Sequence, residues 1–206
     1  MTMKSPTTKE RFGLRQWIEL LLGTAALGVS AISLWIAIGT EEANRQMVAA
    51  ASWPLLQADT SNLPEGGHPI IHFVLINGGV GPAKLKSLEV SWRGKAFAGA
   101  VPLLEACCGY KPSSGPADLR IAGRTPIMTG GVHNVVILAG EKRNFLTMAL
   151  GSDNVDVWRK LDIARRELRF RACYCSVFDE CWNSNLMDLE PRRVEACPAV
   201  SVPYIE

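Results

Sequence analysis

The sequence has little of what enzymes and nucleic-acid-binding proteins usually need. Only three of its 206 residues are histidine, and it contains no Gly-x-Ser-x-Gly, P-loop or dinucleotide-binding glycine motif. Four of the 22 basic and two of the 20 acidic residues precede Thr40, which leaves 18 of each in the rest of the chain. Because that part is neutral, it has no electrostatic footprint for nucleic acid. We therefore expect neither an enzyme nor a nucleic-acid-binding protein, and no cofactor.

Charged side chains are also absent from the whole run between Leu20 and Ile38. As a helix, a run of this length rises about 28 Å, close to the hydrocarbon thickness of a bilayer. Trp17 and Trp35 fall near the two expected membrane interfaces, where amphipathic rings prefer to lie. The sequence therefore predicts one transmembrane helix near the N-terminus.

The basic residues around this run lie mostly on one side of it. Lys4, Lys9, Arg11 and Arg15 precede it, whereas only Arg45 follows it closely. The positive-inside bias then predicts a cytoplasmic N-terminus and an exported C-terminal part. A cleaved signal peptide would have a shorter apolar region with a small-residue site directly after it, so we expect the helix to be retained as an anchor.

Small residues recur along the expected membrane helix at a spacing of three and four: Gly23, Ala26, Ser30, Ser33 and Ala37. This spacing aligns them on one helix face, where a second transmembrane helix can approach closely. The helix therefore has a candidate packing face for another membrane protein or for a second copy of this chain. The alternative is that these residues are simply common in membrane helices.

Cysteine is missing from the N-terminal part, and all six cysteines lie after the apolar run: Cys107, Cys108, Cys173, Cys175, Cys181 and Cys197. An even number of cysteines in an exported domain is typical of disulfide bonds. No Asn-x-Ser/Thr sequon occurs among eight asparagines, which favours a bacterial periplasm over an ER lumen. A thiol-redox pair and a cysteine-rich metal site stay open as alternatives, although no Cys-x-x-Cys motif supports either.

Local geometry disfavours two of the possible cysteine pairs. Adjacent Cys107 and Cys108 can bridge only through a distorted ring. Cys173 and Cys175 are two apart on an expected strand, so their Cβ vectors are parallel. We therefore expect disulfides between more distant cysteines.

A hairpin turned at Phe178-Asp179 would bring Cys175 and Cys181 opposite each other. We predict a disulfide between these two cysteines. Cys107 and Cys108 are then left to bond with Cys173 and Cys197, and these bonds would pin the C-terminal tail.

After the anchor, runs of β-branched and aromatic residues separated by Gly, Pro and Asn predict a β-rich domain. In the expected strand at 84–93, the apolar residues change from one face of the strand to the other, which predicts a bulge near Lys86-Ser87. The segment from Asn77 to Pro82 supplies residues tolerant of positive φ for a turn. We expect strands at 68–76 (buried on both faces), 84–93 and 169–178, two strands within 135–150, and helices at 102–109 and from an N-cap at Ser152 or Asp153 to about residue 164.

The succession of strand, Asn77-Gly78-Gly79, Gly81-Pro82-Ala83, strand and Gly94-Lys95, followed later by Leu138-Ala139-Gly140-Glu141, resembles the immunoglobulin-like β-sandwich modules of many exported bacterial proteins. The whole chain is also similar to membrane-anchored bacterial proteins that carry no assigned function. These motifs are turn chemistry, so the resemblance implies a fold and brings no catalytic residues with it. The helical insertion at 152–164 departs from the family's pattern.

Two further segments are candidate contact surfaces. The segment from Gly109 to Gly131 is rich in Gly and Pro, and within it we single out Tyr110, Lys111 and Arg120; simple flexibility is the alternative. Basic residues also cluster between Arg159 and Arg171. We interpret this cluster as a solvated face, with docking to anionic lipid or to an acidic partner as the alternative.

Together these patterns predict a mainly β protein: an immunoglobulin-like β-sandwich with one or two short helices, preceded by a single N-terminal transmembrane helix. The expected divisions are a cytoplasmic basic tail (1–16), the membrane helix (17–39), a juxtamembrane helix (40–52) and a disulfide-bearing periplasmic domain (53–206). The expected function is a non-enzymatic interaction module in the inner membrane that contacts another membrane or envelope protein. A thiol-redox or metal-binding envelope protein is the alternative.

Overall fold

The computed structural model describes residues 13–111 and 127–206, and the chain divides into two compact units between Ala49 and Ala50. Helix α1 (Leu14–Ala51) lies in the first unit except for its last two residues, and its apolar part has a mean hydropathy of 2.0. This helix, near the N-terminus, is long and apolar enough to span a membrane. It continues past the apolar run, as expected, and ends just before Pro54, which cannot extend a helix.

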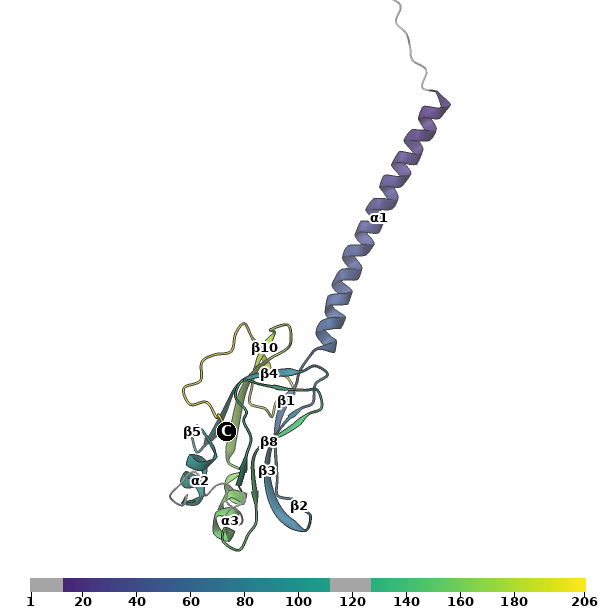
Figure 1. Ribbon diagram of the computed structural model, residues 1–206. Coiled ribbons are helices and arrows are strands. Elements are labelled where there is room, and N and C mark those ends of the chain that lie inside the picture. Colours follow the sequence, from purple (N-terminus) through teal and green to yellow (C-terminus); the bar gives the residue numbers. More distant parts are fainter. Residues whose placement is uncertain (1–12, 112–126) are drawn as a thin grey trace, which may run out of the picture. The chain divides into compact units, whose positions relative to one another are not determined.

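The second unit is a β-rich domain of two antiparallel sheets (Figure 1). The first sheet has the order β1 (Leu56–Ser61), β3 (His68–Asn77), β8 (Lys142–Ala149) and β6 (Ile127–Thr129), with β2 (Pro64–Glu65) paired to β3. The second has the order β11 (Arg192–Val194), β10 (Cys181–Ser184), β9 (Leu168–Cys175), β4 (Ala83–Trp92) and β5 (Lys95–Phe97), with β7 (Val135–Ile137) paired to β4. A β-rich domain after an apolar N-terminal helix is thus confirmed.

Aromatic side chains join the inner faces of the two sheets. Phe73 and Phe145 of the first sheet lie 6.4 and 5.9 Å from the ring of Phe170 in the second, measured between centroids. The ring of Tyr204, near the C-terminus, packs 5.6 Å from that of Phe145 and is fully buried. Because edge-to-face aromatic pairs add to the free energy of apolar burial, this cluster closes the core and holds the end of the chain in it.

The strands follow the predicted patterns with one correction. In β3, Ile71, Phe73 and Leu75 are buried, whereas the residues between them are only partly buried. The prediction that this strand is buried on both faces was therefore wrong, since its outer face reaches solvent. The predicted bulge in β4 is confirmed by a shift in its pairing with β9 between Leu85 and Ser87.

The two helices of the domain pack against each other (Figure 1). Helix α2 (Ala100–Cys108) ends where predicted, because Gly109 adopts φ 70° and donates its backbone N–H to the carbonyl of Glu105. Helix α3 (Val155–Ala164) begins later than predicted: its N-cap is Asn154 and not Ser152 or Asp153. The Asn154 side chain instead bonds to the backbone of the preceding loop, accepting from Gly151 N and donating to a carbonyl of β8.

The glycines of the β3–β4 turn serve close packing and not positive φ, which corrects the sequence-based interpretation. Neither Gly79 nor Gly81 has a positive φ. A Cβ on Gly79 would lie 2.4 Å from the backbone nitrogen of Leu55, and one on Gly81 would lie 2.0 Å from the carbonyl oxygen of Ser52. Only glycine lets this turn lie against the segment that leads into β1.

Candidate functional site

All six cysteines form disulfides in the structure, in the pairs Cys107–Cys108, Cys173–Cys197 and Cys175–Cys181. The predicted hairpin pair Cys175–Cys181 is confirmed, because the β9–β10 register places these residues directly opposite each other. Cys197 pins the C-terminal tail, as expected, but its partner is Cys173 and not Cys107 or Cys108.

The prediction that Cys107 and Cys108 bond to distant cysteines was wrong. Cys108 ends α2 and is buried in the core between the sheets. Cys173 lies on the outer face of β9, where it alternates with the core residues Ala172 and Tyr174. Because the two sites lie on opposite sides of one sheet, the adjacent cysteines pair with each other, with Cα atoms 3.7 Å apart.

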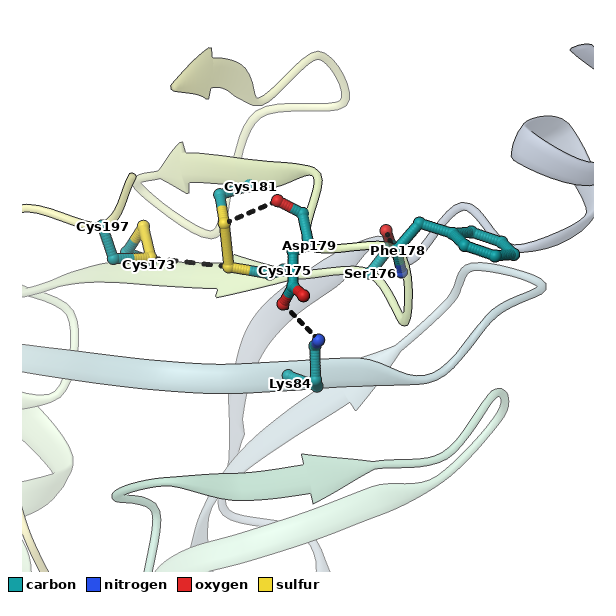
Figure 2. Close-up of a disulfide and its surroundings, with 8 residues drawn as sticks. All are labelled: Lys84, Cys173, Cys175, Ser176, Phe178, Asp179, Cys181 and Cys197. Atoms are coloured by element: carbon teal, nitrogen blue, oxygen red, sulfur yellow. Dashed lines mark hydrogen bonds and ion pairs between the residues drawn. A yellow bond between two sulfur atoms is a disulfide. The ribbon is translucent and has the colours of Figure 1, made fainter. Parts of the chain in front are cut away.

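The other two disulfides form a cluster, which we call the cysteine cluster (Cys173, Cys175, Cys181 and Cys197). The sulfurs of Cys175, Cys181 and Cys197 all lie within 4.8 Å of one another, and those of Cys175 and Cys197 are 3.9 Å apart (Figure 2). The separation between the sulfurs of Cys175 and Cys197 is close to that between two thiolates on a tetrahedral zinc ion. Each sulfur is bonded to another sulfur, however, and metal ligation requires free thiolates.

A cavity of about 570 Å³ opens beside the cysteine cluster and is lined by three of its cysteines, all except Cys173. Charged groups surround this cavity: Lys86, Asp179 and Glu195. The ammonium of Lys84 binds the carboxylate of Asp179 and holds the pKa of that carboxyl below its ordinary value. Of the three cysteines at the cavity, Cys175 and Cys181 are buried and Cys197 is partly exposed.

A second hollow, of about 580 Å³, lies at one margin of the domain and is called here the arginine-lined groove. It is built from four places in the chain, which are β1, β4, the segment from the end of α3 into β9, and the residues after β10. Its lining residues are Ala58, Asp59, Thr60, Glu89, Ser91, Arg165, Arg166, Leu168, Arg169, Phe170, Arg171, Asn185 and Met187.

The four arginines of the groove fall into two classes. Arg165 is tied inward, since its guanidinium bonds to Asp162 at 2.8 Å and donates to the carbonyl of Thr60 at 3.2 Å. Arg169 folds back onto the carbonyl oxygen of Leu168 at 3.0 Å. The remaining two, Arg166 and Arg171, are exposed, and within residues 13–111 and 127–206 no ion pair or hydrogen bond engages their guanidinium groups.

The same groove contains a strand edge without a neighbour. On one side of β9, strand β10 pairs only with residues 172–175. On the other side, strand β4 pairs with every residue of β9. Among the described residues, no strand pairs with the other edge of Leu168–Arg171. An unpaired strand edge presents backbone N–H and C=O groups at every second residue, the arrangement to which an extended peptide adds. Here those residues are Leu168 and Phe170, and a peptide would have to displace the Arg169 guanidinium from the carbonyl of Leu168.

The sequence indicated this groove only through its basic cluster. Arg165, Arg166, Arg169 and Arg171 belong to that cluster, but Arg159 and Lys160 lie outside the groove. Asp59, Glu89 and Met187 were not singled out, because each comes from a different part of the chain. Only their place in the fold brings them to one hollow.

Of the three contact-loop candidates, one is buried, one is exposed and one lies outside the described residues. Tyr110 is only 9% exposed and belongs to the core cluster, so it offers little contact surface. Lys111 is exposed, at the end of the described segment. Arg120 lies outside the described residues.

Along α1, the small-residue face forms a shallow hollow on the helix surface. Gly23, Ala26 and Ser30 line it, together with larger residues on either side. Ser30 donates its hydroxyl to the carbonyl of Ala26 at 2.8 Å, so its polar group is satisfied within the helix. Ser33 and Ala37 continue the same spacing toward the C-terminal end and are exposed.

Comparisons with family models, with curated proteins and with solved structures found no match to this chain. The resemblance to membrane-anchored immunoglobulin-like proteins therefore stays a prediction.

Proposed function

We propose that this chain is a membrane-anchored, non-enzymatic interaction module of the bacterial periplasm, and that its arginine-lined groove binds an acidic, extended segment of another membrane or envelope protein. The observation that carries the proposal is the groove, in which exposed Arg166 and Arg171 flank the unpaired edge of β9. Charge and shape together favour an acidic peptide in strand conformation, since backbone pairing supplies affinity and the arginines supply specificity.

Strand order supports the immunoglobulin-like part of the proposal. In their order across the first sheet, β1, β3, β8 and β6 correspond to strands A, B, E and D of an immunoglobulin-type sheet. Strands β10, β9, β4 and β5 correspond to G, F, C and C′ of the opposing sheet. Modules of this architecture commonly bind other proteins, although the fold alone specifies no partner.

Two acidic side chains in the groove limit what it can bind. Asp59 accepts a hydrogen bond from the backbone N–H of Thr60 at 2.8 Å, and Glu89 lies opposite Arg171 in the β4–β9 pairing. These groups offset part of the positive charge of the four arginines. We therefore expect a partner segment with acidic residues spaced to reach Arg166 and Arg171, and little affinity for a uniformly charged polyanion.

The test places a photo-crosslinking amino acid at Met187, on the rim of the groove, in the full-length chain in its native membrane. A specific crosslinked protein is expected, and the R166E/R171E variant should weaken its capture at least about tenfold, since both free guanidinium groups are reversed in charge. The matched control is R159E/R192E, which makes the same charge change on exposed residues outside the groove.

The outcomes separate this proposal from its rivals. Capture that is lost in the groove variant and kept in the control supports an acidic protein partner. If no protein is captured, or if both variants lose it equally, the groove is not the binding surface. Crosslinking from Met187 to anionic phospholipid rather than to protein, abolished by R166E/R171E alone, would instead assign the groove to lipid headgroups.

The anchor and its orientation are part of the same proposal. Retention of α1, a cytoplasmic N-terminus and a periplasmic domain are supported by the length of the helix and by the basic residues that precede it. A reporter fused after Glu206 should be active only in the periplasm, and the N-terminal residue of the mature chain should precede α1.

Replacing Ser30 and Ser33 with leucine should weaken any assembly made through the small-residue face.

A further inference from the structure

The two disulfides of the cysteine cluster are close enough to exchange partners. Sγ of Cys175 lies 3.9 Å from Sγ of Cys197, although each is bonded elsewhere (Figure 2). Two disulfides that only staple separate parts of a domain need no such proximity. Here three chain segments, β9, β10 and the C-terminal tail, bring four sulfurs together on the outer face of one sheet.

Access to the cluster is uneven. Cys175, Cys181 and Cys197 line the 570 Å³ cavity and Cys173 does not, although Cys173 and Cys175 are both only 2% exposed and Cys181 is 6% exposed. Cys197 is the most exposed of the four. A small thiol entering the cavity therefore meets the Cys175–Cys181 disulfide at its more exposed sulfur, that of Cys181, and meets the Cys173–Cys197 disulfide at Cys197.

We propose that the cysteine cluster is a thiol–disulfide exchange centre that accepts a small-molecule thiol. The incoming thiolate attacks Sγ of Cys181, a mixed disulfide forms there, and Cys175 leaves as a thiolate. That thiolate attacks Sγ of Cys197, the Cys175–Cys197 bond forms, and Cys173 leaves as a thiolate and takes a proton from water. Each step makes one S–S bond and breaks one, so no oxidant is needed.

The centre works independently of the arginine-lined groove. Exchange keeps the tail bonded to β9, because Cys197 moves from Cys173 to Cys175 on the same strand. The mixed disulfide at Cys181 would display the incoming thiol at the cavity. The domain can therefore carry a thiol adduct without losing the bond that pins its tail.

The first experiment uses the full-length C181S variant, which leaves Cys175 without its partner and needs no external thiol. The folded protein is alkylated without reduction, and its disulfide-linked peptides are mapped by tandem mass spectrometry, with fragmentation at Tyr174 separating Cys173 from Cys175. Both Cys173–Cys197 and Cys175–Cys197 linkages are expected. A thiol confined to Cys175, with Cys173–Cys197 intact, would overturn the proposal.

The matched control is C107S, which frees one thiol at Cys108, on the other side of the sheet. It should retain Cys175–Cys181 and Cys173–Cys197 unchanged. A Cys175–Cys197 linkage in this control would mean that the bonds scramble during handling, and would overturn the inference drawn from C181S.

A second experiment covers the case in which C181S does not fold, as judged by near-ultraviolet circular dichroism. The wild-type protein is incubated with reduced glutathione and alkylated. A glutathione adduct on Cys181 together with a Cys175–Cys197 linkage is expected. If glutathione leaves both disulfides intact, or if only a protein dithiol opens them, the centre does not accept small thiols and the proposal fails.

Discussion

Replacing Asn77 with alanine is expected to destabilise the β-rich domain strongly, because this buried side chain uses its full hydrogen-bonding capacity inside the protein. Its oxygen accepts from the backbone N–H groups of Leu55 at 3.2 Å and Gly79 at 3.1 Å. Its amide nitrogen donates to the carbonyl oxygens of Gly81 at 2.8 Å and Ile137 at 3.0 Å. One side chain thus ties the entry to β1, the β3–β4 turn and the end of β7.

The magnitude follows from counting these bonds. Each intramolecular hydrogen bond contributes about 1 kcal/mol net, and buried groups left without a partner cost more. Two of the four bonds are buried and two are partly buried. We therefore expect Asn77→Ala to lower the free energy of unfolding by about 3 kcal/mol, which corresponds to a Tm lower by roughly 6–12 °C for a domain of this size.

The assay is thermal unfolding of the full-length protein in detergent micelles, followed by near-ultraviolet circular dichroism. The matched control is Asn144→Ala, which removes the same group from an exposed position in β8 and should change stability by less than about 0.5 kcal/mol. Equal Tm values for the two variants would refute the reasoning, since the Asn77 network would then contribute no net stability.

Three further predictions use the same unfolding assay. Gly81→Ala should cost about 2 kcal/mol or more, because its Cβ would lie 2.0 Å from a backbone oxygen, whereas Gly78→Ala meets only ordinary contacts at 3.5 Å and should fold normally. Replacing Cys173 and Cys197 together with alanine should cost about 3 kcal/mol through the loop they close, and an unchanged Tm would contradict the stapling role. A backbone N–H and an arginine lower the pKa of Glu141, so this carboxylate stabilises the fold above its unfolded pKa of about 4.3 and loses that effect as pH falls through the lower folded value. Glu141→Gln should therefore lower Tm at pH 7 by an amount equivalent to less than about 1 kcal/mol and flatten the acid dependence; an equal loss at pH 7 and pH 2 would contradict it.

Local patterns in the sequence were sufficient for the elements and for one disulfide. Alternation of apolar residues located β9, and the turn at Asp179 set the hairpin that pairs Cys175 with Cys181. The change of the apolar residues from one face to the other located the bulge in β4, and Gly109 located the end of α2. These features depend on residues within about ten positions of one another, so the backbone geometry of one element decides them.

The glycines of the β3–β4 turn depend on contacts that neighbouring residues do not specify. Gly79 and Gly81 were assigned to positive φ, the usual local reason for glycine. The structure requires them because the segment before β1 passes within contact distance, and that segment comes from before β2 and β3 in the chain. Close approach between segments that are separate in the chain leaves no pattern in the neighbouring residues. The need for glycine in this turn could therefore be predicted from the sequence, whereas the reason for it could not.

By itself, the sequence determined the apolar helix, the alternating strands, the turns and the Cys175–Cys181 pair, because each depends on the periodicity or register of neighbouring residues. Only the tertiary structure decided that Cys107 pairs with its neighbour Cys108, since the choice depends on which side of the second sheet each cysteine occupies. The arginine-lined groove and the cysteine cluster were decided in the same way. Both gather side chains from segments far apart in the chain, and packing the two sheets together is what brings those segments to one surface.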